Sequence, residues 1–425
     1  MQLFNIQVIN GNSFREQSEK RMLRTETVVA PRGEIYDRNG VVLATSKLSF
    51  NIELYKVRVE PKEQNLALAK LIEILDKNED KIYSNFPIND ELNALNFETP
   101  EQEKKWKKDN KIDENSDFDS VIDFFIKKYE LEDVCNPINK TLQIKIIKIK
   151  YEGAQSAYSL FNSATIAKDI SEKSVAQIEE RKSELFGVNI TSVPKRYYPN
   201  SNLTAHTVGY VNKVSDSEYE KIKEQGYNIN SVIGKNGIEQ SFETYLRGKD
   251  GVTKSETDIQ GNISSEYISE EPISGKNVTL TLDYRLQQVA QDSLEMGING
   301  LRNGTLVGKK IPDADAGSVV VLDVETGEVL AMVNYPTYDT NKFVNGISTK
   351  DWLELTKDPV KPMYNRAIAG TYSPGSTYKM LVGIAGLKAG GMTVQEKIRD
   401  PGIYPYGHHP KCWIFSQYGI THRIC

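Results

Sequence analysis

A serine followed by a lysine three residues later occurs in this chain at Ser376–Lys379 and again at Ser192–Lys195. A serine hydroxyl can act as a nucleophile when a neighbouring neutral lysine amine accepts its proton. The spacing alone does not decide this chemistry, because Pro194 opposes a helix at the second pair and the sequence there predicts a strand or turn. The second pair therefore serves as a comparison within the chain.

The sequence around Ser376 predicts the first turn of a helix. Ser373 is a good N-cap, Pro374 suits the first helical position, and Ser376 falls at the third. The apolar residues that follow have helical spacing: Met380, Leu381, Ile384 and Leu387. Gly390–Gly391 is expected to end the helix. Positions i and i+3 share a helix face, so the Lys379 amine can approach the Ser376 hydroxyl where the helix dipole favours negative charge.

An ordinary capped core helix with an exposed lysine is the alternative at this position. Lysine can accept a proton only in its neutral form, which requires burial or a nearby cation to lower its pKa. The sequence does not show that environment.

The composition makes nucleic acid an improbable partner. Lysine and arginine total 53 against 58 aspartate and glutamate residues, a net charge of -5, so no basic field attracts nucleic acid. No run of about 18 apolar residues predicts a membrane span, and the N-terminus lacks the apolar core of a signal peptide. The first residues resemble an alternating strand that starts abruptly, so we expect a preceding segment to be missing.

Cysteine and histidine concentrate in residues 400–425. The ligand types and spacing of Cys412, His422 and Cys425 are typical of a zinc site, because thiolates and imidazole give tetrahedral coordination. Candidates for a fourth ligand are Asp400, His408 and His409. A Cys412–Cys425 disulfide and unlinked thiols with surface histidines remain open as alternatives.

The N-terminal half alternates between strand and helix patterns. Residues 31–55 predict short strands around a turn at Asp37–Gly40, whose Asn-Gly is a hairpin signal. From about 60 to 185 the spacing and charge predict a mainly helical insertion. Residues 234–251 predict a Gly-bounded amphipathic helix with Ile238, Phe242 and Leu246 on one face.

A polar, turn-rich stretch at 255–275 predicts a domain boundary. Beyond it, a short strand runs into a helix, and two strands surround the turn at Glu325–Gly327. We interpret these elements as the sheet and first helix of a second domain.

The segment Y-N-R-A-I-A-G-T-Y-S-P-G-S-T-Y-K, Tyr364–Lys379, resembles the active-site region of the class B penicillin-binding proteins, which are peptidoglycan transpeptidases. Four other segments resemble the same family and follow its expected order, at 32–44, 196–211, 234–251 and 317–339. Together these segments span almost the whole chain.

The resemblance implies a multidomain α+β fold. Residues 1–265 would form an N-terminal pedestal of the dimerisation type, β-rich and helical, with the insertion at about 60–185. Residues 266–425 would form the N-terminal part of an incomplete transpeptidase domain, an antiparallel sheet with flanking helices. It also implies a single membrane anchor, missing from this chain, with the domains on the extracytoplasmic side of a bacterial cell membrane.

Carried over by resemblance, Ser376 would attack the D-Ala-D-Ala carbonyl of a stem peptide while Lys379 accepts its proton. Release of D-Ala would leave an acyl-enzyme, which an amine from a neighbouring stem peptide would resolve. β-Lactams would acylate the same serine. The Ser376 backbone N–H would supply half of the oxyanion hole.

The chain also departs from the family pattern. No S-x-N segment and no K-[ST]-G strand follow Ser376, so we expect the 425 residues alone to be inactive or severely impaired. The cysteine and histidine cluster resembles the elongation-type branch, some members of which bind zinc beside the active site. By that resemblance Asp400 is the preferred fourth ligand, joining Cys412, His422 and Cys425.

The resemblance implies four kinds of partner: stem peptides, β-lactam antibiotics, a membrane glycan polymerase of the SEDS type and cell-shape scaffold proteins. Rival functions are a division or sporulation transpeptidase of the same class, a D,D-carboxypeptidase or β-lactamase using the same Ser-Lys chemistry, and a non-catalytic β-lactam sensor or scaffold. The zinc-like cluster favours the elongation role.

Overall fold

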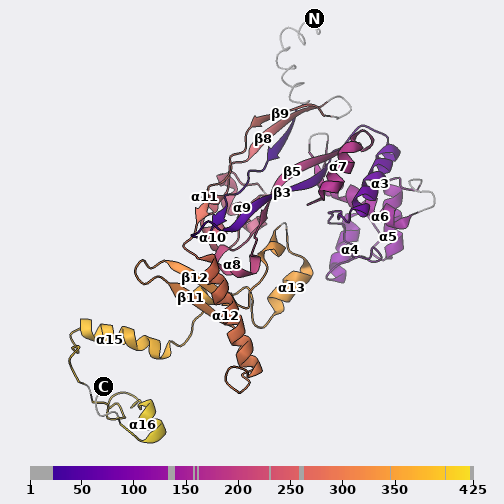
Figure 1. Cartoon of the computed structure of the whole chain (residues 1–425). Coiled ribbons are helices and arrows are strands. Elements are labelled where there is room, and N and C mark those ends of the chain that lie inside the picture. The colour runs from indigo at the N-terminus through magenta and orange to yellow at the C-terminus, as the bar shows by residue number, and fades with distance from the viewer. Residues whose placement is uncertain are drawn as a thin grey trace. The chain divides into compact units, whose positions relative to one another are not determined.

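The computed structural model describes residues 23–132, 139–156, 158–159, 162–228, 231–257, 263–344, 346–397 and 399–421 (Figure 1). The chain packs as two units, one ending at Ala367 and the other beginning at Ile368. None of the described helices is both long and apolar enough to cross a membrane.

Helices and strands are mixed throughout the first unit, in agreement with the expected α+β class. Its helices are α3 (Pro61–Lys77), α4 (Pro100–Asp109), α5 (Phe118–Lys128), α6 (Lys140–Gln155), α7 (Glu172–Glu180), α8 (Ser201–Val208), α9 (Asp216–Ile222), α10 (Gly237–Ser241), α11 (Glu243–Leu246), α12 (Tyr284–Asn303) and α13 (Thr349–Lys357). A further short helix, α14 (Arg366–Ala369), spans the boundary between the units. The second unit contains α15 (Tyr378–Lys388) and α16 (Trp413–Tyr418).

The first sheet joins the start of the described chain to a hairpin far along the sequence. Its antiparallel strands lie in the order β1 (Leu23–Val28), β8 (Gly251–Thr257) and β9 (Ile263–Glu270). The stretch at 255–275, which the sequence predicts to be a boundary, thus contributes to a β-hairpin. Tyr267 and Ile268 on β9 are both about half exposed, so backbone pairing holds this ribbon without a buried apolar face.

The second sheet is built around the long strand β3. It contains β10 (Val278–Thr279), β2 (Ile35–Tyr36), β3 (Val42–Leu54) and β4 (Ala164–Ala167) in that order, and β5 (Val188–Tyr197) also pairs with β3. The predicted turn between β2 and β3 is confirmed. The Asp37 carboxylate accepts hydrogen bonds from the N–H groups of Asn39 and Val41, and Gly40 adopts a φ of 83°. Glycine adopts this left-handed conformation at no steric cost.

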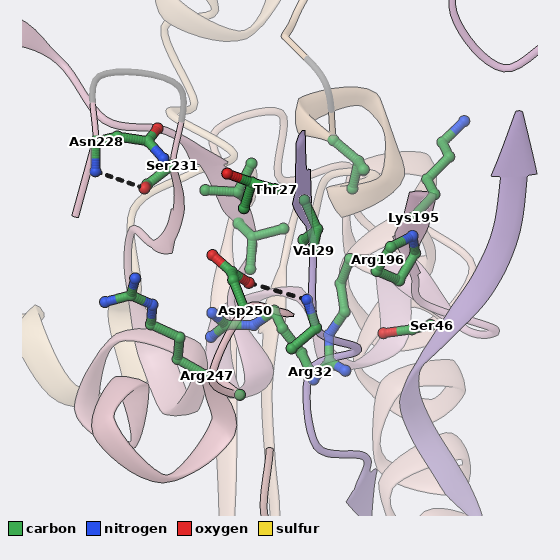
Figure 2. A pocket seen from close by; sticks show the side chains of 16 residues that line it. Thr27, Val29, Arg32, Ser46, Lys195, Arg196, Asn228, Ser231, Arg247 and Asp250 are labelled. Carbon is green, nitrogen blue, oxygen red and sulfur yellow. Dashed lines mark hydrogen bonds between the residues drawn. The ribbon is translucent and has the colours of Figure 1, made fainter. Parts of the chain in front are cut away.

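A buried ionic network holds this sheet to α10. Glu239 is fully buried, and its two carboxylate oxygens accept hydrogen bonds from Arg32 Nη2 at 2.8 Å and Arg196 Nε at 2.6 Å. Burial disfavours the charged form of Arg32, but Glu239 and Glu243 outweigh this effect and raise its pKa. Figure 2 shows Arg32 and Arg196 beside the cavity that they line. Each charge in the network therefore depends on its partner to offset the cost of burial.

The residues around Glu239 do not form the single amphipathic helix that the sequence predicts for 234–251. The helix breaks at Phe242, which gives the short helices α10 and α11. Leu246 is fully buried as expected, but Phe242 is 37% exposed. The prediction was wrong in the unbroken helix and in Phe242, while Ile238 and Leu246 pack inward and Glu239 faces its two arginine partners.

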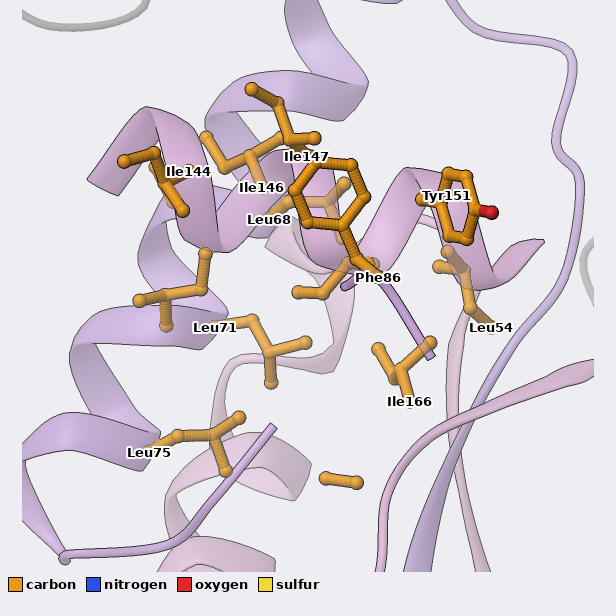
Figure 3. Packing of buried hydrophobic residues seen from close by; sticks show 14 of the residues in the cluster. Leu54, Leu68, Leu71, Leu75, Phe86, Ile144, Ile146, Ile147, Tyr151 and Ile166 are labelled. Carbon is orange, nitrogen blue, oxygen red and sulfur yellow. The ribbon is translucent and has the colours of Figure 1, made fainter. Parts of the chain in front are cut away.

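The region between 60 and 185 has its own apolar core. Helix α3 buries one side through the helically spaced Leu68, Leu71 and Leu75. These side chains pack against α6, β3 and β4, as Figure 3 shows. Phe86 meets the rings of Trp106, Phe125 and Tyr151 edge-on, with centroids 5.1–5.7 Å apart. Each buried leucine contributes about 1.5–3 kcal/mol, so this cluster supplies a large part of the free energy that holds the helices together.

The predicted strand–helix and two-strand patterns beyond residue 275 are confirmed. Strands β11 (Gly317–Leu322) and β12 (Val329–Tyr335) form an antiparallel hairpin whose turn includes Gly327, with a φ of 76°. Helix α12 packs on this hairpin. The buried Gln287 side chain exchanges hydrogen bonds with the backbone of Met332 at 2.8 Å and donates another to the Leu203 carbonyl of α8. One side chain thus ties α12 to both β12 and α8.

A last pair of short strands, β6 (Val211–Lys213) and β7 (Val232–Gly234), lies beside the ionic network. Gly234 donates its N–H to the Glu243 carboxylate. Tyr198 donates its hydroxyl to Glu239 and accepts the Val211 N–H. The network therefore extends into this hairpin.

We expect Glu239→Ala to destabilise the first unit by about 3–5 kcal/mol, because two buried guanidinium groups would lose their shared carboxylate. Urea unfolding followed by circular dichroism measures the change. Glu220→Ala is the matched control: it removes an exposed partner of Lys223 and should cost less than about 1 kcal/mol. Equal unfolding midpoints for the two variants would show that the network carries no stability.

Candidate active site

Ser376 and Lys379 lie at the start of α15 in the second unit. Ser376 belongs to a 3-10 turn, Gly375–Thr377, and Lys379 to the first turn of the α-helix that follows. The prediction of Ser373 as N-cap was wrong. The chain enters the helix through Pro374, whose carbonyl accepts hydrogen bonds from the backbone N–H and the hydroxyl of Thr377. Hydrogen bonds between Thr377 and Pro374 therefore close the opening turn, and the Ser373 side chain does not cap it.

The predicted end of this helix is confirmed. Gly390 has a φ of 69°, and the N–H of Gly391 bonds to the carbonyl of Gly386, as in a glycine-terminated helix. Within the second unit α15 buries no residue. Its exposed apolar side chains include Met380, Leu381, Ile384 and Leu387. Such a helix has to gain apolar partners from outside this unit before it can serve as a core element.

The comparison pair, Ser192 and Lys195, lies in strand β5 as predicted. Ser192 pairs with Phe50 and Lys195 with Lys47 across the ladder to β3. Residues three apart on a strand point to opposite faces, so this lysine does not share a face with this serine. Lys195 instead forms an ion pair with Asp169. The shared Ser-x-x-Lys spacing thus has different consequences on the strand and at the helix start.

A polar clamp holds the chain just before it enters the second unit. Asn334, buried on β12, accepts the Ala367 N–H at 2.9 Å and donates its side-chain N–H to Asn365 at 3.2 Å. Asn365 in turn donates to the carbonyl of His206 on α8.

Arg366 adds a second set of contacts in the same segment. It is buried and donates hydrogen bonds to the carbonyls of Val360, Lys361 and Tyr364. Sequence reasoning missed these residues, because an isolated asparagine or arginine carries no periodic signal.

A pocket of about 830 Å³ in the second unit brings together Lys379, Asp400 and Cys412. Asp400 accepts the Gly402 N–H at 2.7 Å, and Cys412 donates its N–H to the Gly402 carbonyl at 2.9 Å. Two of the four predicted metal ligands thus line one wall. The other two, His422 and Cys425, lie outside the described residues.

The alternative ligands do not line this pocket. His408 and His409 are both exposed, and the His409 ring lies 3.3 Å from the Tyr404 carbonyl. Within the described residues no three potential metal-ligating side chains cluster. A set completed by His422 and Cys425 involves residues beyond that range.

Two family models match the chain. The Penicillin-binding Protein dimerisation domain matches residues 27–280, and the Penicillin binding protein transpeptidase domain matches residues 317–423. The chain belongs to the penicillin-binding proteins. Ser376 and Lys379 fall within the transpeptidase match, and the Glu239 network falls within the dimerisation match.

Named relatives agree with this membership. The peptidoglycan D,D-transpeptidase MrdA of Acinetobacter baumannii is 28% identical over 420 residues, which cover 98% of this chain and 50% of that protein. The protein of the same name from Escherichia coli K12 is 27% identical over 405 residues, covering 94% of this chain and 50% of its own length. The chain spans about half the length of these relatives.

Solved structures confirm the fold. The complex between Penicillin-Binding Protein (PBP2) and MreC from Helicobacter pylori aligns with a TM-score of 0.59 at 24% identity, covering 95% of this chain and 59% of that one. A peptidoglycan synthase complex aligns with a TM-score of 0.58 at 24% identity, covering 100% of this chain and 58% of its counterpart. The α+β penicillin-binding fold expected from the sequence is therefore correct.

His206 links the clamp to the core of this family member. Its Nε2 lies 2.8 Å from the Pro362 carbonyl, and its ring packs edge-on against Tyr338. Burial lowers the pKa of His206 from its ordinary value of 6.5, and the positive charge of Arg366 adds to this effect, although the hydrogen bond to Pro362 opposes it. The folded state therefore favours neutral histidine.

We expect the first unit to lose stability as pH falls below about 6.5, because the unfolded chain then takes up a proton that folded His206 resists. The contribution of His206 is full above that pH and declines as pH drops toward the lower folded pKa. Thermal unfolding of the wild type and His206→Gln between pH 7.5 and 5 tests this. The variant keeps a donor for Pro362 and should have a flatter profile, whereas His408→Gln should match the wild type. Parallel profiles for wild type and His206→Gln would exclude the effect.

Proposed function

We propose that the protein to which this chain belongs is a peptidoglycan D,D-transpeptidase of the elongation type, acting through a serine acyl-enzyme. The observation that carries the proposal is the placement of Ser376 and Lys379 at one helix start inside the transpeptidase match. The likeness to MrdA proteins over 94–98% of the chain supports the elongation role.

The proposed chemistry follows from that placement. The Ser376 hydroxyl attacks the carbonyl between the two D-Ala residues of a stem peptide, and Lys379 accepts the hydroxyl proton. Collapse of the tetrahedral intermediate expels D-Ala, whose amine takes up a proton, and leaves an ester on Ser376. An amine from a second stem peptide attacks the ester and restores the serine. A β-lactam acylates the same oxygen through opening of its ring.

The start of this helix favours the negative charge that develops on the substrate carbonyl oxygen during attack by Ser376. Backbone N–H groups in the first turn of a helix lack intrahelical acceptors and carry partial positive charge. The N–H of Ser376 belongs to this turn, so it is suited to stabilise an oxyanion formed at its own ester. The second donor of the oxyanion hole would come from a K-[ST]-G strand beyond Cys425.

Partners of two kinds are proposed from related complexes. One related structure is a PBP2 complex with MreC, and another is a complex described as coordinating polymerization and crosslinking. We infer a cell-shape scaffold protein and a membrane glycan polymerase as partners of the whole protein, with the domains held on the extracytoplasmic side of the cell membrane.

Zinc is proposed as a structural ion near this site. Asp400 and Cys412 line the same pocket as Lys379, and a carboxylate with a thiolate fits the donor preferences of Zn²⁺. His422 and Cys425 would complete four ligands. The ion would add a further link to the loop that follows α15, where Gly402 already bonds to Asp400 and Cys412 and Ile403 pairs with Lys411.

We expect a fluorescent penicillin to label the whole protein containing this chain at Ser376. Ser376→Ala should abolish labelling, and Lys379→Ala should slow it by about 10²–10⁴-fold through loss of the proton acceptor. Ser192→Ala is the matched control and should label normally, because its lysine lies on the other face of β5. Gel fluorescence and peptide mapping give the readout. Labelling that persists in Ser376→Ala would overturn the assignment.

Elemental analysis of protein purified without chelator should find about one zinc per chain. Cys412→Ser and Cys425→Ser should each lower the zinc content, whereas His408→Gln should leave it unchanged, because His408 does not line the pocket. Wild-type protein without stoichiometric zinc, or His408→Gln without metal, would contradict the proposed ligand set.

A further inference from the structure

A second cavity, of about 380 Å³, lies in the dimerisation region, remote in sequence from Ser376. It opens between the end of β1, strand β5 and the segment after α11, as Figure 2 shows. Its size falls within the range of small-molecule sites. Polar and apolar side chains line different parts of its wall, so it is suited to a ligand with both characters.

Two opposite charges line this cavity without pairing with each other or with another described residue. Arg247 donates Nη2 to the Gly226 carbonyl at 2.8 Å, and its guanidinium lies 3.7 Å from the centroid of the Tyr227 ring. Asp250 accepts the Ala30 N–H at 2.9 Å. Neutral groups therefore fix both side chains, and each retains its charge for a ligand.

The other basic residues of the wall are already neutralised. Arg32 and Arg196 share Glu239, and Lys195 pairs with Asp169. The charges left for a ligand are therefore one guanidinium and one carboxylate. A phosphate dianion would face Asp250 without compensation, whereas a molecule with one positive and one negative group matches both.

Two nitrogen atoms behind this wall also lack a hydrogen-bond partner. Arg32 Nη1 and Arg196 Nη2 are buried and have no hydrogen-bond acceptor among the described residues. Both residues line the cavity, so its wall is short of acceptors. Because both nitrogen atoms are buried, they do not face the open cavity, and Arg247 is the cationic group left to contact a ligand carboxylate.

The remaining lining has a polar part, formed by Thr27, Ser46, Asn228 and Ser231, and an aliphatic part. The aliphatic part consists of Val29, Ala30, Pro194, Val211, Val232 and Val344. Gly248 is closely packed in this wall, because a Cβ at this position would come within 2.3 Å of the Ile273 carbonyl oxygen and 2.6 Å of the Ala30 side chain. A branched aliphatic side chain can bury its surface here, at about 0.8 kcal/mol per CH₂ group.

We propose that this cavity binds an α-amino acid with an aliphatic side chain. Arg247 holds the ligand carboxylate, Asp250 holds its ammonium group, and the valine-rich wall covers the side chain. Arg247 and Asp250 lie in the dimerisation match, and neither Ser376 nor Lys379 lines the cavity, so the site does not depend on the proposed transpeptidase activity.

The test is calorimetric titration of the full chain with L-leucine and D-leucine. Two analogues each lack one charge: 4-methylpentanoate has no ammonium group, and 3-methylbutylamine has no carboxylate. We expect at least one leucine enantiomer to bind at one site per chain, and both analogues to bind at least about 10-fold more weakly, since each loses one charge-assisted contact.

Single-site variants separate the two contacts. Asp250→Asn keeps the acceptor for Ala30 and should weaken leucine binding about 10-fold or more without further weakening 4-methylpentanoate. Arg247→Gln should weaken leucine similarly without further weakening 3-methylbutylamine. Arg302→Gln, which removes an exposed partner of Asp315, is the control and should bind leucine as the wild type does.

Several results would overturn the proposal. Binding of 4-methylpentanoate as tight as that of leucine would show that Asp250 does not hold an ammonium group. No detectable heat with either enantiomer at about 100-fold excess would show that the cavity does not take this ligand. Leucine affinities of Asp250→Asn and Arg247→Gln that match that of Arg302→Gln would show that neither side chain contacts the ligand.

Discussion

The carboxylate of Glu239 is the constraint on which the dimerisation region depends. It is fully buried and forms ion pairs with two arginines from distant parts of the chain. Because a charge buried without partners costs several kcal/mol, the loop after β1, strand β5 and helix α10 can fold only together. Tyr198 extends the same arrangement, since its backbone exchanges two hydrogen bonds with the Asn341 side chain. The segment around Asn341, which follows the β11–β12 hairpin, thus connects to a framework that begins at Arg32.

Local sequence patterns were sufficient where an element is decided by its own residues. The turn at Asp37–Gly40 needs only an aspartate to accept N–H groups and a glycine to take a positive φ. Strand β5, helix α12 and the β11–β12 hairpin follow from apolar spacing and turn residues in the same way. The break at Phe242 could not be predicted by this route, because the residues that draw Glu239 inward lie near positions 32 and 196. The strand β9 was missed because a solvated ribbon has no apolar face to reveal it.

The candidate active site shows the same difference between local sequence properties and contacts between distant segments. The type and spacing of Ser376 and Lys379 are local properties, and the structure places both at one helix start. Within the second unit α15 buries none of its residues, so neither local pattern nor packing in that unit determines the environment of Lys379. The clamp of Asn334 and Asn365 depends equally on contacts between segments. Arg247 and Asp250 form a candidate binding site only because their contacts with Ala30, Gly226 and Tyr227 hold them beside one cavity.

The separation between Arg32 and Glu239 has a consequence for biosynthesis. The two residues are 207 positions apart, and strand β1 pairs with β8, which lies in the same distant region of the sequence. At about 5–20 residues per second, a ribosome needs roughly 10–40 s to deliver Glu239 after Arg32 has emerged. During that interval β1 has an unpaired edge and Arg32 has no carboxylate to neutralise it. A chaperone could therefore bind the unpaired β1, or an acidic surface the uncompensated Arg32, while this part of the dimerisation region is being synthesised.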